Sequence, residues 1–126
     1  MREEINNWWK QANADIKSAE NSFNAGDYYL SVFMCQQAVE KGLKSLCLLK
    51  LKRSIPGHSL IYLGKLLKVP SMVWKDIQSL NPEYITTRYP DVANAAPVDI
   101  YNEEIAKSHL QEAKRVFIWL KQQIKE

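Results

Sequence analysis

One segment, residues 26–52, limits the fold of this chain more than any other part of the sequence. It predicts a single long helix, because Asp27 can cap its N-terminus after Gly26 and basic residues gather in its last turn. Its apolar residues form two adjoining stripes, and a few more lie on the far side. A helix of this kind is the central helix of a bundle, or it is covered by a second subunit.

The remaining chain predicts further helices around this one. Residues 3–24 carry a single apolar face, and the short break after them makes the first two long helices antiparallel neighbours. A short helix follows over residues 59–68, and Ser71 can cap another. Asp99 or Asn102 can cap the last helix, whose apolar residues alternate four and three apart.

These elements define the expected fold class. The chain is all-α, an up-and-down antiparallel helical bundle of three long helices plus one or two short ones, and a single domain spans residues 1–126. The formal net charge of +3 permits contact with nucleic acid or with an acidic partner but requires neither.

The two cysteines indicate a compartment. Cys35 and Cys47 lie on the central helix about 18 Å apart, so they cannot pair with each other and are expected to be core thiols. Core thiols fit a reducing cytosol, and no signal peptide or membrane-spanning run is apparent. We therefore expect a cytoplasmic protein without a membrane partner.

Residues 82–98 predict an irregular segment. Its three prolines and a threonine pair argue against a helix, and Pro90 favours an extended backbone at Tyr89. Irregular segments of this length are uncommon in a small domain and are usually functional or disordered.

Arg88 and Tyr89 are the most suggestive residues of this segment. They offer a planar five-donor fork beside a stacking ring, a combination that suits a phosphate and a base. The alternative is that Arg88 forms a salt bridge with Glu40 or Asp91 and only pins the segment.

A second candidate group lies midway along the central helix. Gln37, Glu40, Lys41 and Lys44 fall within one arc of about 100°. Glu40 and Lys44 could be an ordinary solvated pair four residues apart. Alternatively, the group lies beneath the segment 82–98 and holds other charged groups in position.

His58 is the third candidate. It follows a Pro-Gly turn and could act as a general acid or base near neutral pH, or it could merely help cap the next helix or pack half-buried. No glycine-rich phosphate loop, metal-ligand cluster or hydrolase motif accompanies it, so we expect no metal and no cofactor.

Three stretches together resemble the HEPN (higher eukaryotes and prokaryotes nucleotide-binding) domain family: GDYYLSVFMCQQAVEKGLKSLCL, GHSLIYL and TTRYPD. The resemblance implies a helical bundle that usually dimerises. It also implies a partner, a minimal nucleotidyltransferase, in a toxin–antitoxin-like module. Family members bind nucleotides or RNA, and many are metal-independent ribonucleases.

The ribonuclease members carry an arginine and a histidine separated by four to six residues. Arg53 and His58 fit this spacing, although they straddle a Pro-Gly turn instead of lying on a late helix. The branch with the RYPD segment looks more like a nucleotide- or RNA-binding subunit, with Arg88 and Tyr89 as its contacts.

The sequence thus predicts a homodimeric subunit that binds nucleotide or RNA phosphate and pairs with a nucleotidyltransferase. The expected ligand-binding residues are Arg88, Tyr89, Asp91, Glu40, Lys44 and Gln37, together with His58. One alternative is a metal-independent ribonuclease toxin that uses His58 with Arg53 or Arg88. The other is a structural dimerisation module without a ligand.

Overall fold

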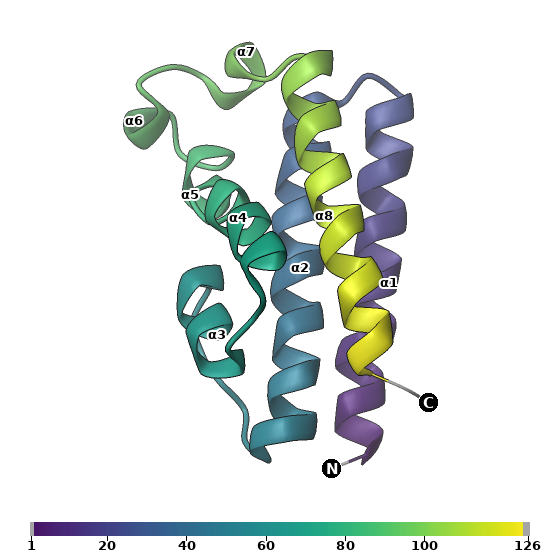
Figure 1. Cartoon of the computed structure of the whole chain (residues 1–126). Helices are drawn as coiled ribbons and strands as arrows, with labels where there is room; N and C mark the ends of the chain where they lie inside the picture. The colour runs from purple at the N-terminus through teal and green to yellow at the C-terminus, as the bar shows by residue number, and fades with distance from the viewer. Residues whose placement is uncertain (1, 125–126) are drawn as a thin grey trace.

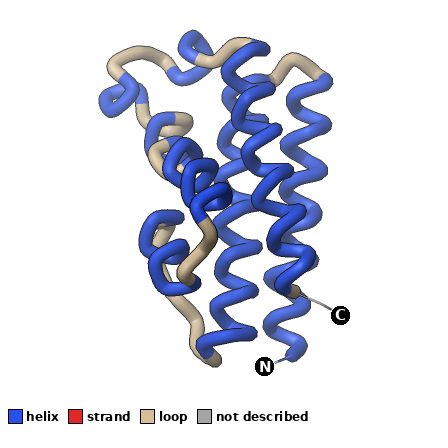
Figure 2. The backbone as a smooth tube through the Cα atoms, viewed as in Figure 1, coloured by secondary structure: helices blue, strands red, loops and turns tan. Residues whose placement is uncertain are grey.

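Three long helices dominate the computed structural model, which describes residues 2–124 (Figure 1). They are α1 (Arg2–Asn24), α2 (Tyr28–Leu51) and α8 (Glu103–Gln123). Helix α1 runs antiparallel to α2, and α8 runs antiparallel to α1 because the intervening chain returns to the far end of the bundle first (Figure 1). Within residues 2–124 every regular element is helical (Figure 2), which confirms the all-α bundle.

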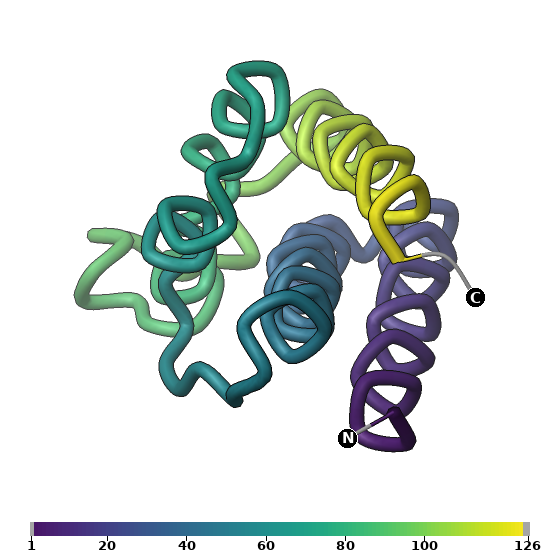
Figure 3. The backbone as a smooth tube through the Cα atoms, turned by 60° about the horizontal axis from the view of Figure 1, so that its bottom comes forward, coloured from purple at the N-terminus to yellow at the C-terminus, as the bar shows by residue number. Residues whose placement is uncertain are grey.

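Helix α2 is the centre of the molecule. It lies between α1 and α8 on one side and the short helices α3 and α5 on the other (Figure 3). All its residues from 42 to 48 are buried, and Leu43 and Leu46 are completely inaccessible. Gly42 permits this packing, since a Cβ there would lie 2.6 Å from Leu120 Cδ1. The chain therefore covers its own central helix, and a second subunit is not needed for that purpose.

Two of the expected caps differ in detail. Asp27 occupies the N-cap position of α2, but its side chain makes no capping hydrogen bond. Pro70 is the N-cap of α4 (Ser71–Leu80), so Ser71 is the first residue of that helix and not its cap. Proline fits there because its extended backbone leads into the first turn without needing an N–H. Helix α3 (Leu60–Leu67) is capped by Ser59, whose hydroxyl accepts from the Tyr62 N–H.

The expectation of an irregular segment over residues 82–98 is wrong. The structure has three single-turn helices there: α5 (Glu83–Thr86), α6 (Pro90–Ala93) and α7 (Pro97–Ile100). Prolines that exclude a long helix are well suited to the first position of a short one, because the N–H they lack has no helical partner there.

Two local predictions around this segment are confirmed. Tyr89 has an extended backbone, with φ of −122° and ψ of 113°. Asn102 caps α8 by accepting from the Ile105 N–H, whereas Asp99 lies within α7.

The core thiols are also confirmed. Cys35 and Cys47 are fully buried, and burial raises the pKa of Cys35 to about 12 and that of Cys47 to about 11. Both thiols stay protonated near neutral pH and serve as apolar packing groups. None of the helices described is both long and apolar enough to cross a membrane.

Candidate functional site

A buried carboxylate on α2 organises the candidate site. Glu40 is only 4% exposed, and it accepts hydrogen bonds from Lys44 Nζ at 2.9 Å and Gln36 Nε2 at 3.3 Å. Its two oxygens also lie 3.1 and 3.2 Å from Nδ1 of His58. Lys44 is 8% exposed, so the interpretation of Glu40 and Lys44 as an ordinary solvated pair is wrong.

This carboxylate sets the tautomer of His58. An ionised carboxylate can only accept, so the Nδ1 atom facing Glu40 carries a proton. Gln36 Nε2 also donates to the His58 carbonyl at 3.3 Å, which fixes the backbone at the same point. The imidazole is half-exposed, and its Nε2 atom has no hydrogen-bond partner within residues 2–124. Nε2 is therefore free to bind a ligand or to transfer a proton.

Tyr84 connects this histidine to Arg88. Its ring stacks on the His58 imidazole, with centroids 4.0 Å apart and planes 13° from parallel. The Arg88 guanidinium carbon lies 4.8 Å from the Tyr84 centroid, 5.6 Å from that of Phe33 and 5.5 Å from that of Tyr89. Arg88 lies in the turn that follows α5, four residues after Tyr84, and its guanidinium packs on the Tyr84 ring.

The positive charge of Arg88 is not neutralised by a neighbour. Among residues 2–124 it forms no ion pair, so the structure does not have the salt bridge with Glu40 or Asp91 that was the alternative. Three aromatic faces hold the guanidinium in place by cation–π contacts instead. Its exposed donors remain available for an anion.

A hollow of about 280 Å³ adjoins the imidazole. It lies between the start of α3 and the single turn of α5 and is lined by His58, Ser59, Asn81, Tyr84 and Ile85. This volume falls just below the range typical of whole small-molecule sites, so it suits one part of a ligand, such as a base or a phosphate.

The other predicted site residues lie at different distances from this centre. Gln37 donates to the Gln36 side chain at 2.8 Å and thus supports Glu40 indirectly. Asp91 is exposed in the first turn of α6, next to Tyr89 and Pro90. Arg53 is exposed beyond the end of α2, and within residues 2–124 it forms no hydrogen bond or ion pair.

Lys41 does not belong to the site. It turns toward α1, where Nζ lies 2.5 Å from Asp15, and so ties α1 to α2. The prediction that the four polar residues form one group is therefore wrong for Lys41. Lys41 faces α1, whereas Lys44 pairs with Glu40, which faces His58.

A second buried cluster fixes α5 to α8. The Tyr101 hydroxyl donates to the Glu83 carboxylate, and His109 Nε2 lies 3.3 Å from the same carboxylate. His109 Nδ1 lies 2.7 Å from Glu112. Both ring nitrogens therefore face carboxylates, which favours the doubly protonated imidazolium.

The charges in this cluster shift two pKa values. Burial alone would lower the pKa of His109, but the hydrogen bonds and charges of Glu112 and Glu83 outweigh it and raise the pKa to about 9. Burial and Glu83 raise the pKa of Tyr101 well above its usual range. Because Glu83 precedes Tyr84 directly, this cluster determines where the stacking ring of the candidate site lies.

The site residues predicted from the sequence did not include Tyr84, Gln36 or the Glu83 cluster. A spacing of four residues brings Tyr84 and Arg88 together only where the backbone is helical, and the prolines had argued against a helix here. Gln36 was overlooked because glutamine is usually a surface residue, yet here it is completely buried.

The comparisons with known proteins agree with this architecture. The family model of the HEPN domain matches residues 5–123 of the chain. The chain belongs to the HEPN domain family. No curated protein matches it, whereas solved structures do.

Two solved structures of similar proteins extend over nearly the whole domain. TT1696 from Thermus thermophilus is 30% identical, with a TM-score of 0.85 over 95% of this chain and 98% of that protein. ST0689, an archaeal HEPN homologue, is 34% identical, with a TM-score of 0.82 over 96% of this chain and 98% of its own. The HEPN fold thus accounts for the whole bundle described above.

Proposed function

We propose that this HEPN-domain protein binds the phosphate and base of a nucleotide or an RNA strand at a surface formed by His58, Tyr84, Arg88 and Tyr89. One observation carries the proposal. The Arg88 guanidinium is held against three aromatic rings without an anionic partner among the described residues, and one of these rings, Tyr84, also stacks on the His58 imidazole, whose Nε2 is free.

Each residue has a distinct role in this proposal. Arg88 binds a phosphate through its planar fork, and Tyr89, which is 44% exposed, provides a stacking face for a base. His58 donates or accepts at a second oxygen through Nε2. Glu40 and Lys44 lie beneath and hold the imidazole in one orientation.

Removal of Arg88 is expected to weaken binding about 10- to 100-fold, since a charge-assisted hydrogen bond is worth about 1.5–3 kcal/mol. The measurement is titration of a fluorescent single-stranded RNA, with ATP as a competitor, into wild type and Arg88→Ala. Arg53→Ala is the matched control, because it removes the same charge from an exposed position outside the site. Absence of saturable binding by wild type, or equal losses in both variants, would contradict the proposal.

The same RNA mixtures, run on a gel in the presence of a chelator, distinguish binding from cleavage. Products that depend on His58, and vanish in His58→Ala, would assign the ribonuclease function instead. The observation that favours this second candidate is the ordered Glu40–His58 pair, which leaves a proton-transferring nitrogen at the surface.

The proposed partners rest on family membership. HEPN proteins are often dimeric, so we propose a homodimer that associates with a minimal nucleotidyltransferase in a toxin–antitoxin-like pair. The protein's own helices cover most of α2, so we place the dimer contact on another surface.

A further inference from the structure

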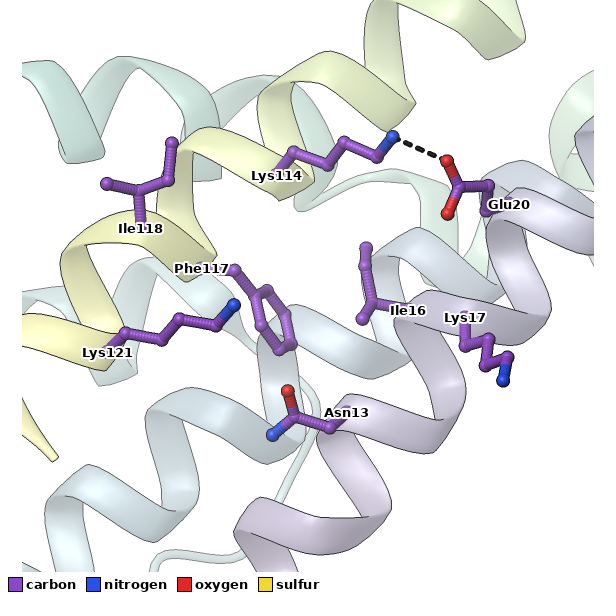
Figure 4. A pocket seen from close by; sticks show the side chains of 8 residues that line it. All are labelled: Asn13, Ile16, Lys17, Glu20, Lys114, Phe117, Ile118 and Lys121. Carbon is purple, nitrogen blue, oxygen red and sulfur yellow. Dashed lines mark hydrogen bonds and ion pairs between the residues drawn. The ribbon is translucent and has the colours of Figure 1, made fainter. Parts of the chain in front are cut away.

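A lysine-lined groove lies between α1 and α8. These two helices pack on the other side of α2 from α3 and α5 (Figure 3). Its main hollow, of about 370 Å³, is lined on one side by α1 and on the other by α8 (Figure 4). A second hollow of about 210 Å³ continues it toward the start of α8 and shares Glu20 and Lys114 with the first. None of the residues of the proposed nucleotide site lines either hollow.

The charged residues that line this groove are mostly positive. Within residues 2–124, Glu20 is the only acidic residue that lines the two hollows, whereas four lysines do so: Lys17, Lys107, Lys114 and Lys121. Their combined formal charge of +3 equals that of the entire 126-residue chain. The groove therefore carries a local excess of positive charge, which favours the binding of a polyanion.

The spacing of the lysines suits an extended ligand. Lys107, Lys114 and Lys121 are seven residues apart, so they form a row along α8 with steps of about 10.5 Å. A stacked nucleic acid strand carries one phosphate per about 3.4 Å, so each step spans about three nucleotides. The row matches a strand of about six nucleotides.

The floor of the groove is apolar. Phe117 and Ile16 form it, and the Phe117 ring stacks on Trp9 with centroids 5.5 Å apart. Figure 4 shows the ammonium of Lys121 beside the Phe117 ring. Phe117 is only 4% exposed, so the floor closes the groove from below and the lysines make the contacts with a ligand.

One ion pair crosses the groove. Lys114 Nζ lies 2.8 Å from Glu20, and both side chains are about half exposed (Figure 4). Such exposed pairs contribute little to stability, so a phosphate can replace the carboxylate at low cost.

From these observations we propose that the α1–α8 groove binds the backbone of a single-stranded RNA and is a second site, separate from the one at Arg88. The test uses fluorescence anisotropy with an oligoadenylate of about twelve nucleotides, twice the expected footprint. It is carried out in both wild type and Arg88→Ala, so that the proposal for each site is tested separately from the other.

Replacement of two lysines in the groove is expected to weaken RNA binding at least 10-fold. The double variant Lys114→Gln/Lys121→Gln should also lower the slope of log affinity against log salt by about 1.4, at about 0.7 per lost contact. Lys65→Gln/Lys75→Gln removes the same charge from α3 and α4 and is expected to change both values much less. Equal losses in the two double variants would overturn the site in favour of a general charge effect.

Two further measurements test the role of the ion pair and the chemical class of the ligand. Glu20→Gln frees Lys114 and is expected to strengthen binding, so weaker binding would contradict the role assigned to that pair. Poly-glutamate should compete poorly, and competition equal to that of RNA would overturn the assignment to nucleic acid. One result separates the two proposals. If Arg88→Ala leaves the RNA affinity unchanged and Lys114→Gln/Lys121→Gln lowers it, the data contradict the nucleotide site at Arg88 and support the groove.

Discussion

Replacement of Glu40 by alanine is expected to destabilise the folded protein by about 3–5 kcal/mol. The substitution leaves Lys44 buried at 8% exposure without its carboxylate, and it removes the acceptor of Gln36 and of His58 Nδ1. A buried charge without a partner loses its hydration and gains nothing in return. Urea denaturation followed by far-UV circular dichroism measures the loss as a shift of the unfolding midpoint.

Two controls separate the unpaired charge from the loss of side-chain volume. The double variant Glu40→Leu/Lys44→Met replaces both charges by apolar groups of similar size and is expected to recover most of the lost stability. Glu20→Ala breaks the exposed pair with Lys114 and should cost less than about 1 kcal/mol. A Glu40→Ala protein as stable as Glu20→Ala would show that the buried network does not support α2.

The cluster at His109 is expected to make the protein less stable at alkaline pH. The pKa of His109 is about 9 in the folded protein, against 6.5 for an unperturbed histidine, so its contribution is fully present below about pH 6.5. That contribution falls as pH rises through about 9, because the folded protein then loses the proton that binds Glu83 and Glu112. The total change is on the order of 3 kcal/mol.

Denaturation midpoints measured between pH 6 and pH 10 test this dependence. His109→Gln has no titrating group at this position, so its stability should be lower at pH 6 and nearly flat across the window. The groups facing His109 are Glu83 from α5, Glu112 from α8 and, through Glu83, Tyr101. An unchanged slope in His109→Gln would assign the alkaline loss to other groups.

The helical bundle could be predicted from the sequence because the spacing of the apolar residues determines which helices form and which faces they bury. The enclosed character of α2, the single apolar face of α1 and the Asn102 cap follow directly from local spacing and side-chain chemistry. The α5–α7 region was predicted less well, since proline excludes long helices but starts short ones, and the pattern alone does not distinguish the two.

The candidate site was predicted only in part, because it depends on contacts between distant segments. Glu40, His58 and Arg88 were all candidates, yet the ring that joins the last two belongs to Tyr84. The position of Tyr84 depends on the contact between Glu83 and His109. These two residues are 26 positions apart, so no local sequence pattern predicts their contact.

We expect a ligand bound at Arg88 to reach the free edge of His58 past the Tyr84 ring that both residues contact. The protein has two histidines, and the second, His109, is buried in a separate cluster and serves as an internal control. The most direct measurement is NMR titration of both imidazole signals with AMP or a short RNA. We expect saturable shifts at His58 that disappear in Arg88→Ala, with the His109 signals unchanged. Static His58 signals at ligand concentrations that saturate binding would contradict it.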